Sequence, residues 1–328
     1  MKKYRNDFIF IFLLIAAFAF FYFRIPANAI SLNKLVNSSN PNVFDQSRLE
    51  LGRKYNNFLA SGLPKETPTI LHYLIGNQRK FLDLRINQAI KEIKNTPVAS
   101  GKIHVWTLMN MGSVIKTKSK IIVFDASDVP FSTVHKQLAD LADIFIVSHG
   151  DTDHYDPQLL AKAIKNGKQV VFLEGLMTDN KSPLAHPLKS GQTIDINGTK
   201  ITAYQTDHRG DHKFLEPSAW FLVKVDGFTI LHTGDGRDFK DKSEQNVVYG
   251  RSDIDILLVN NAIHPYNIRD LKPKVFVPLH LYKWMAGKEF LDTSNFDSVN
   301  NIYLKYETSL AGMDKKMLFN GEGFEYSK

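Results

Sequence analysis

The chain has 328 residues, of which 43% are hydrophobic and 12% aromatic, enough apolar material for one large domain or two ordinary ones. The formal net charge of +7 is spread along the chain without a block of like charges, so the charge gives no reason to expect a nucleic-acid partner. Cysteine is absent, which excludes disulfides and thiolate ligands. Any metal must therefore be held by His, Asp or Glu.

Residues 1–29 have the features of a targeting segment. Three basic residues precede residues 8–23, which carry no charge, and Ala27-Asn28-Ala29 has the small-x-small form of a signal peptidase site. Sixteen uncharged residues are few for a full membrane span, so we expect a signal peptide, with an N-terminal membrane anchor as the alternative. In both cases the rest of the chain is expected to be exported, either periplasmic or secreted. Loss of residues 1–29 removes four basic residues and one acidic residue, which leaves a charge of about +4.

Residues 30–100 are predicted to form a linker and a helical extension. The stretch from residue 30 to residue 42 is rich in Ser and Asn, which is typical of a linker. Residues 44–59 and 81–93 have apolar residues at helical spacing. Neither predicted helix carries obvious chemistry.

Residues 101–328 are predicted to form one domain that is rich in short strands. We expect strands at 103–108, 113–117, 121–124, 144–147, 170–173, 254–259 and 275–277, and helices at 134–141 and 157–164. Asn197-Gly198 and Asp226-Gly227 are turn pairs of two hairpins, which join 192–196 to 200–204 and 220–225 to 229–231.

One stretch reads as a buried strand that leads into a loop of metal ligands. Four apolar residues at 144–147 are followed by His149, Asp151, Asp153 and His154 within six positions. Neutral imidazole and ionised carboxylate groups bind divalent cations, so this loop could supply ligands to one ion or to two neighbouring ions.

Two other readings of this loop fail. A calcium-binding EF-hand is excluded because Asp156 stands where glycine is required and Lys162 where a bidentate glutamate is required. A catalytic serine is also excluded, because Ser148 has no GxSxG context around it. A transition-metal loop survives, but it needs further ligands from elsewhere in the chain.

Further candidate ligands follow other predicted strands. His208, Asp235 and His280 each come directly after an apolar segment, as His149 does. Because sites in sheet proteins collect at the ends of strands, we expect these loops to converge in space.

With these positions assembled, the chain resembles the metallo-β-lactamase-fold hydrolases over roughly residues 102–285. The matching positions are His149, Asp151, Asp153, His154, His208, Gly234-Asp235 and His280, and Asp125 matches a structural aspartate that the family often has. The stretch His232-Thr233-Gly234-Asp235 is similar to the ascorbate-lactonase-type and phospholipase-D-type branch. One departure is Asp151, where the common motif has His, so that the motif here is HxDxDH.

The resemblance implies an α/β fold, the four-layered αββα metallo-β-lactamase sandwich, here with an N-terminal helical extension. It also implies two divalent metal ions: His149, Asp151 and His208 would hold the first, and Asp153, His154 and His280 the second. Asp235 would lie between the ions, and Asp153 and Asp235 are the residues expected to be catalytic. Zinc is the expected metal, with manganese or iron as alternatives, because Asp151 makes the first site richer in oxygen.

Three more histidines lie near these positions. His212 could replace His208 as a ligand, and His232 could orient a ligand or simply pack at its strand end. His264 is placed where it could contact a substrate. No function is assigned to His104, His135 and His186.

The implied chemistry is two-metal hydrolysis, in which a metal-bridged hydroxide attacks a phosphodiester, ester or lactone. The expected partner is a small-molecule or lipid substrate, and a membrane only through an uncleaved N-terminal segment. A true β-lactamase is not expected, because fold does not fix substrate and the motif variant indicates other branches. The alternatives are a non-catalytic metal-binding module of the cell envelope and a manganese-dependent nuclease.

Overall fold

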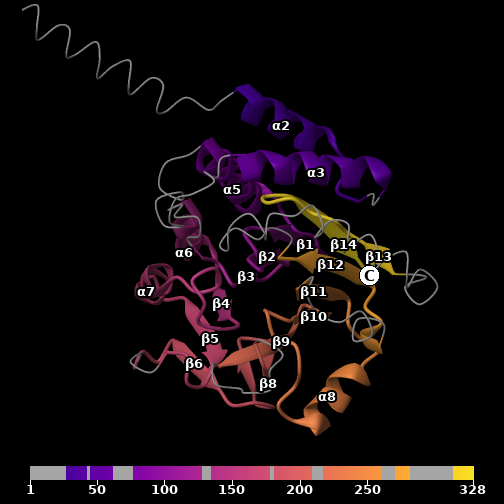
Figure 1. Cartoon of the computed structure of the whole chain (residues 1–328). Helices are drawn as coiled ribbons and strands as arrows, with labels where there is room; N and C mark the ends of the chain where they lie inside the picture. Colours follow the sequence, from indigo (N-terminus) through magenta and orange to yellow (C-terminus); the bar gives the residue numbers. More distant parts are fainter. Residues whose placement is uncertain are drawn as a thin grey trace, which may run out of the picture.

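The computed structural model describes residues 27–42, 45–61, 77–127, 134–177, 181–208, 217–260, 270–280 and 313–328. These residues form two seven-stranded sheets, packed face to face with helices on their outer sides (Figure 1). The expected four-layered αββα sandwich is confirmed.

Both sheets are mixed. The first has the order β14 (Gly323–Ser327), β1 (Lys102–Thr107), β2 (Ser113–Lys116), β3 (Ile121–Phe124), β4 (Ile144–Val147), β5 (Gln169–Leu173) and β6 (Ala185–Leu188). The second has the order β13 (Asp314–Lys315), β12 (Val275–Leu279), β11 (Ile256–Asn260), β10 (Phe228–His232), β9 (Ser218–Val225), β8 (Thr199–Thr206) and β7 (Thr193–Ile196). The pairs from β3 to β6 and from β10 to β13 are parallel, and the others are antiparallel.

Alternation along the strands divides the core into layers. On β4, Ile144 and Ile146 point between the two sheets, whereas Phe145 and Val147 belong to the cluster under the helices. This follows from the two-residue period of a strand, which sends successive side chains to opposite faces. Because both faces are covered, all four residues are buried, as their continuous apolar run predicted.

All strands expected between residues 103 and 277 are present, with bounds shifted by a few residues. The expected helix at 134–141 is instead a 3-10 turn, η1 (Val134–Gln137), followed by the short α6 (Leu138–Leu141). The helix α7 (Pro157–Lys165) is capped by Asp156, whose carboxylate accepts hydrogen bonds from two main-chain N–H groups. After residue 101, four elements were not predicted: β6, α8 (Lys242–Tyr249), β13 and β14.

The prediction of a linker at residues 30–42 is wrong, because most of it lies in the helix α2 (Ala27–Ser38). Ala29, Leu32 and Val36 are spaced by three and four residues, and they are buried on one face of α2, which packs against α5 (Asn77–Asn95). The Ser and Asn residues that suggested a linker occupy the remaining faces. The predicted helix at 44–59 is α3 (Gln46–Ser61).

Two buried arginines attach these helices to the segment before β14. Arg48 of α3 forms an ion pair with Glu322 and donates to the main-chain oxygen of Met317. Arg85 of α5 donates from Nε to the main-chain oxygen of Asn320 at 2.9 Å. The helical extension therefore packs as part of the same core as the sandwich.

Most of the predicted targeting segment lies outside the described residues. Its last three residues, Ala27 to Ala29, begin α2, and Ala29 is fully buried. Among the helices of the described residues, none combines the length and the apolar character needed to cross a bilayer.

Candidate metal centre

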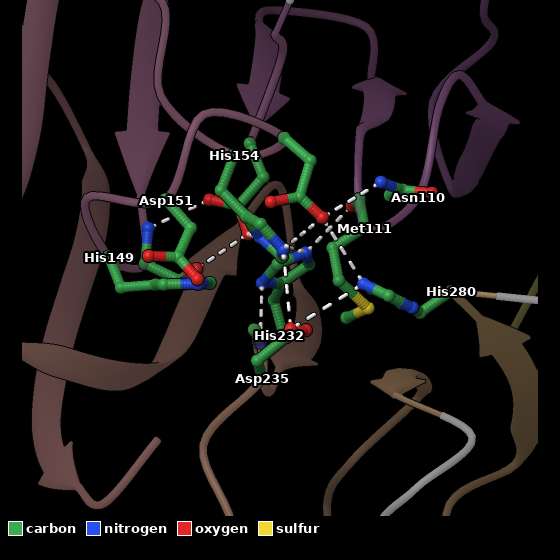
Figure 2. Close-up of polar contacts among 12 residues, drawn as sticks. Asn110, Met111, His149, Asp151, His154, His232, Asp235 and His280 are labelled. Atoms are coloured by element: carbon green, nitrogen blue, oxygen red, sulfur yellow. Dashed lines mark hydrogen bonds and ion pairs between the residues drawn. The ribbon is translucent and has the colours of Figure 1, made fainter. Parts of the chain in front are cut away.

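The expected ligands lie at one edge of the sandwich, where β8, β10 and β12, which run in the same direction within the second sheet, end near the end of β4. His149 follows β4 in the first sheet, while His208, Asp235 and His280 follow β8, β10 and β12 in the second. Figure 2 shows the labelled side chains of His149, Asp151, His154, Asp235 and His280 directed toward one another. The predicted convergence of these loops is thus present.

His149, Asp151 and His208 form a first group of residues whose atoms could hold one metal ion. Oδ2 of Asp151 lies 3.7 Å from Nε2 of His149 and 3.4 Å from Nε2 of His208. Metal bonds of ~2.1 Å in tetrahedral geometry place ligand atoms about 3.4 Å apart. The separations therefore fit three atoms around one ion.

A second group comes from Asp153, His154 and His280. Oδ2 of Asp153 is 3.5 Å from Nε2 of His154 and 3.3 Å from Nε2 of His280. These distances also match the edges of a small coordination polyhedron.

Asp235 lies between the two groups. Its Oδ2 is 3.5 Å from Nε2 of both His154 and His280, and 3.8 Å from Nε2 of His208. Its other oxygen, Oδ1, accepts a hydrogen bond from the side-chain amide of Asn260 at the end of β11. One carboxylate oxygen is therefore shared by both groups, while the amide fixes the orientation of the carboxylate. Asn260 was not among the predicted site residues.

Hydrogen bonds fix which nitrogen of two imidazoles faces the centre. Nδ1 of His154 donates to Asp125 at 2.9 Å, and the hydroxyl of Ser148 donates to the same carboxylate at 2.6 Å. Nδ1 of His149 lies 3.0 Å from the Ser148 oxygen, which can accept a hydrogen bond from it. The Nε2 atoms of His149 and His154 are buried and make no hydrogen bond within the described part of the chain. Buried ring nitrogens without a hydrogen-bond partner fit metal ligation.

The ionisable side chains of the cluster shift one another's pKa values strongly. Burial opposes ionisation, but the neighbouring imidazoles hold the pKa of Asp153 and the pKa of Asp235 well below the ordinary value. In return, despite burial, Asp235 raises the pKa of His154 and that of His280. A metal ion must displace the protons that these imidazoles hold, so acid should weaken metal binding.

His232 supports the centre without facing it. Its Nε2 lies 3.0 Å from the main-chain oxygen of Met111, and its Nδ1 accepts from the N–H of Gly234 at 3.2 Å. Both ring nitrogens are therefore used, and burial lowers the pKa of His232. These contacts and the full burial of His232 fit both expected roles, packing at the strand end and orienting the loop that carries Asp235. Gly234 has a φ of +50°, and a Cβ there would collide with the side chain of Ser148.

Other histidines fall elsewhere. His212 and His264 lie outside the described residues, so their expected roles stay predictions. His104 pairs with Glu325 at 2.7 Å, His135 pairs with Asp156 at 2.8 Å, and His186 contacts Gln169 at 2.6 Å. His135 thus supports the cap of α7, directly after the ligand loop.

Comparisons with known proteins agree with this geometry. The family model described as beta-lactamase superfamily domain matches residues 113–280, just over half of the chain. A UPF0173 metal-dependent hydrolase of Thermococcus kodakarensis is 26% identical over 159 residues, which cover 44% of this chain and 68% of that protein. A UPF0173 metal-dependent hydrolase of Staphylococcus carnosus is 28% identical over 179 residues, covering 46% of this chain and 75% of that protein.

Solved structures show the same fold. Igni18, a metallo hydrolase from Ignicoccus hospitalis, superimposes with a TM-score of 0.51 at 14% identity, covering 69% of this chain and 99% of Igni18. The metallo-beta-lactamase fold protein YhfI of Bacillus subtilis gives a TM-score of 0.50 at 12% identity, covering 69% of this chain and all of YhfI. With the family match and the shared architecture, the chain belongs to the beta-lactamase superfamily and has its metallo-β-lactamase fold.

Proposed function

We propose that the protein is a metal-dependent hydrolase that uses two divalent ions to cleave a phosphodiester, ester or lactone in a small-molecule or lipid substrate. The observation that carries the proposal is the pair of ligand groups that share Oδ2 of Asp235. A pair of bound ions would make water reactive at neutral pH and would stabilise negative charge that develops on the substrate. The relatives named as metal-dependent hydrolases support the same reaction class.

We assign the ligands as the sequence predicted. His149, Asp151 and His208 would hold the first ion, Asp153, His154 and His280 would hold the second, and Asp235 would contribute to both. Zinc is the proposed metal because most ligands are imidazoles. Manganese and iron are the alternatives at the first position, where Asp151 adds oxygen to the ligand set.

The carboxylates of the centre set its charge. Asp151, Asp153 and Asp235 supply three negative charges against the four positive charges of two divalent ions. The low pKa values of these three carboxyl groups keep them ionised at neutral pH. The loaded centre would carry one net positive charge, which a bridging hydroxide would cancel, and the two ions would still attract substrate oxygens that carry negative charge, such as those of a phosphodiester.

Ser148 supports water as the attacking group. Its hydroxyl donates to Asp125 and lies within hydrogen-bonding distance of Nδ1 of His149. A serine nucleophile needs a base that takes its proton and a path to the substrate. Ser148 is instead fully buried, and it holds a proposed ligand in place.

The test is metal analysis and turnover of the purified full chain. Wild-type protein should hold two metal equivalents and should hydrolyse at least one member of a panel of phosphodiesters, esters and lactones supplied with zinc or manganese. Asp235→Asn keeps the side-chain shape, removes the shared charge and should lower turnover by at least about 100-fold. Wild-type protein that binds no metal would refute the proposal.

The same panel separates the alternatives. Two bound equivalents without any turnover would favour a non-catalytic metal-binding module, whereas the hydrolase names of the relatives support catalysis. Cleavage of DNA or RNA with manganese alone would favour the nuclease reading. If the protein hydrolyses members of the panel, we expect lipid or nucleotide phosphodiesters to be its best substrates.

We also propose that the protein is exported and that residues 1–29 direct it. The basic residues before the uncharged run at 8–23 support this, as does the small-x-small site at 27–29. Cleavage after Ala29 would remove the first turn of α2, including a buried residue, so the alternative of a retained anchor gains support from the fold. Cell fractionation together with N-terminal sequencing distinguishes a secreted chain beginning near residue 30 from a membrane-bound chain that keeps its N-terminal segment.

A further inference from the structure

Asn110 connects ligands from both sheets. It lies in the tight turn between β1 and β2, where the N–H of Leu108 donates to the oxygen of Gly112 at 2.7 Å. The side-chain amide of Asn110 donates to Oδ2 of Asp153 at 2.9 Å (Figure 2), and its main-chain oxygen accepts from the N–H of His280 at 3.1 Å. One residue thus holds a carboxylate from the loop after β4 and an imidazole-bearing residue from the end of β12.

We propose that Asn110 is a positioning residue of the metal centre, acting on Asp153 through its side chain and on His280 through its backbone. This inference rests on the proposed function, in which Asp153 and His280 are ligands of the second ion. A neutral amide donor suits this task, because it orients the carboxylate without neutralising the charge that the ion needs. Residues that orient ligands in this way are typically needed for full metal affinity or activity.

The backbone at the two contacts is unusual. Asn110 has a φ of +46° and His280 a φ of +57°, both in the left-handed region. Asparagine tolerates this conformation better than most residues, so a turn alone could explain its presence at position 110. A turn residue normally turns its side chain to solvent, however, whereas Asn110 is only 7% exposed and donates to Asp153. Burial and direction of the amide therefore indicate a role beyond the turn.

The N-terminal helices support the turn through contacts with Asn320. The side-chain amide of Asn320 donates to the main-chain oxygen of Leu108 and contacts the sulfur of Met109 at 3.4 Å. Asn320 in turn accepts from the hydroxyl of Tyr55 at 3.0 Å and from Nε of Arg85 at 2.9 Å. These contacts are buried and continuous from α3 and α5 to the turn. The helical extension thereby supports the same turn that contacts Asp153 and His280.

The test compares Asn110→Gly with Thr107→Val in the full chain, with Co²⁺ as the probe. Glycine keeps the left-handed turn and removes the amide. Thr107 is a matched control: it is buried on β1 beside the turn, and its hydroxyl donates to the main-chain oxygen of Phe319 at 2.9 Å without touching a ligand. Affinity is measured by competition with a chromophoric chelator, geometry by the visible spectrum of bound Co²⁺, and stability by the unfolding temperature of metal-free protein.

We expect Asn110→Gly to bind the second Co²⁺ equivalent about 10- to 100-fold more weakly and with an altered spectrum. Its metal-free unfolding temperature should stay within about 2 °C of wild type, because relief of backbone strain offsets the lost hydrogen bond. Thr107→Val should show the opposite pattern, with a fall of about 2–4 °C and wild-type Co²⁺ affinity. A purely structural role of Asn110 would instead give two variants that lose stability and keep the spectrum.

Failure of this inference is distinguishable from failure of the proposed function. If wild-type protein binds two Co²⁺ equivalents and Asn110→Gly binds them within twofold of the same affinity, the positioning role is overturned while the metal centre stands. If wild-type protein binds no Co²⁺, the proposed function and the positioning role fall together.

Discussion

Asp226, in the turn between β9 and β10, accepts hydrogen bonds from the N–H of Ser119 at 3.0 Å and from its hydroxyl at 2.9 Å. Ser119 lies in the turn between β2 and β3, so this contact joins a hairpin of the second sheet to a hairpin of the first. It thus adds a polar contact to the apolar packing between the sheets.

Asp226→Asn should weaken this contact without disturbing the turn, because asparagine tolerates the φ of +47° found there. Although partial burial opposes it, hydrogen bonds from Thr117 and Ser119 lower the pKa of Asp226 from its ordinary 3.8. A lowered folded-state pKa gives stability that is present above about pH 3.8 and is lost as the pH falls through the folded value. In urea unfolding at pH 7 the variant should lose about 0.5–1 kcal/mol, a figure reduced for solvent exposure. The difference in unfolding free energy between the variant and wild type should become smaller below pH 3.8. A difference that does not change with pH would contradict this explanation.

The orientation of His154 by Asp125 gives a second prediction. Oδ1 of Asp125 accepts from the N–H of Ser148, and Oδ2 accepts from the Ser148 hydroxyl and from His154. In Asp125→Asn one of these oxygens becomes an NH2 group that cannot accept, and the negative charge is lost, so the common anchor of the two proposed imidazole ligands is weakened. We expect metal affinity or turnover to fall by about 10- to 100-fold. Asparagine also tolerates the left-handed φ of +44° at this position, so the substitution tests the charge without adding backbone strain. Unchanged metal content and turnover in a folded variant would show that the anchor is dispensable.

Asp151 is the position at which this chain departs from the common motif, and it should influence metal choice. Asp151→His replaces an oxygen ligand by nitrogen in the first group. Because imidazole suits zinc and carboxylate suits manganese, we expect the ratio of zinc affinity to manganese affinity to rise by at least about tenfold. Competition binding with both ions measures this ratio. An unchanged ratio would indicate that Asp151 does not bind metal.

The inclusion of α2 in the fold is tested by two leucines of the same helix. Leu32 is 6% exposed and Leu35 is 48% exposed. Leu32→Ala should cost about 2–4 kcal/mol of unfolding free energy, because it leaves a cavity under the helix. Leu35→Ala changes helix propensity by the same amount, but its side chain lies on the outer surface, so it should lower the unfolding free energy by no more than about 0.5 kcal/mol. Equal effects in chemical unfolding of the two variants would mean that α2 does not pack as described.

The sequence predicted the strands, and the convergence of the loops that carry the proposed ligands, for the same reason. Buried strands such as β4 are continuous apolar runs, and His149, His208, Asp235 and His280 each stand just after the end of a predicted strand. Both signals are local in sequence, so no knowledge of the fold was required to locate them.

Two supporting asparagines could not be predicted in this way. Asn110 and Asn260 lie 43 and 25 positions from the carboxylates that they contact, and nothing local marks them as partners. Asn110 could have been noticed only as a polar residue within an apolar stretch. The helix α2 was missed because its Ser and Asn residues outweighed the spacing of its three buried residues, and tertiary packing overrides such weak local preferences.

The pairing of β14 with β1 has a consequence for the order of assembly. The side chains of Lys102 on β1 and Glu325 on β14 form an ion pair although the two residues are 223 positions apart. Until the late residues arrive, β1 presents an open row of main-chain donors and acceptors during synthesis. Contacts of such long range form slowly, so the nascent chain passes through a stage that is prone to pairing with the wrong strand or with a neighbouring molecule.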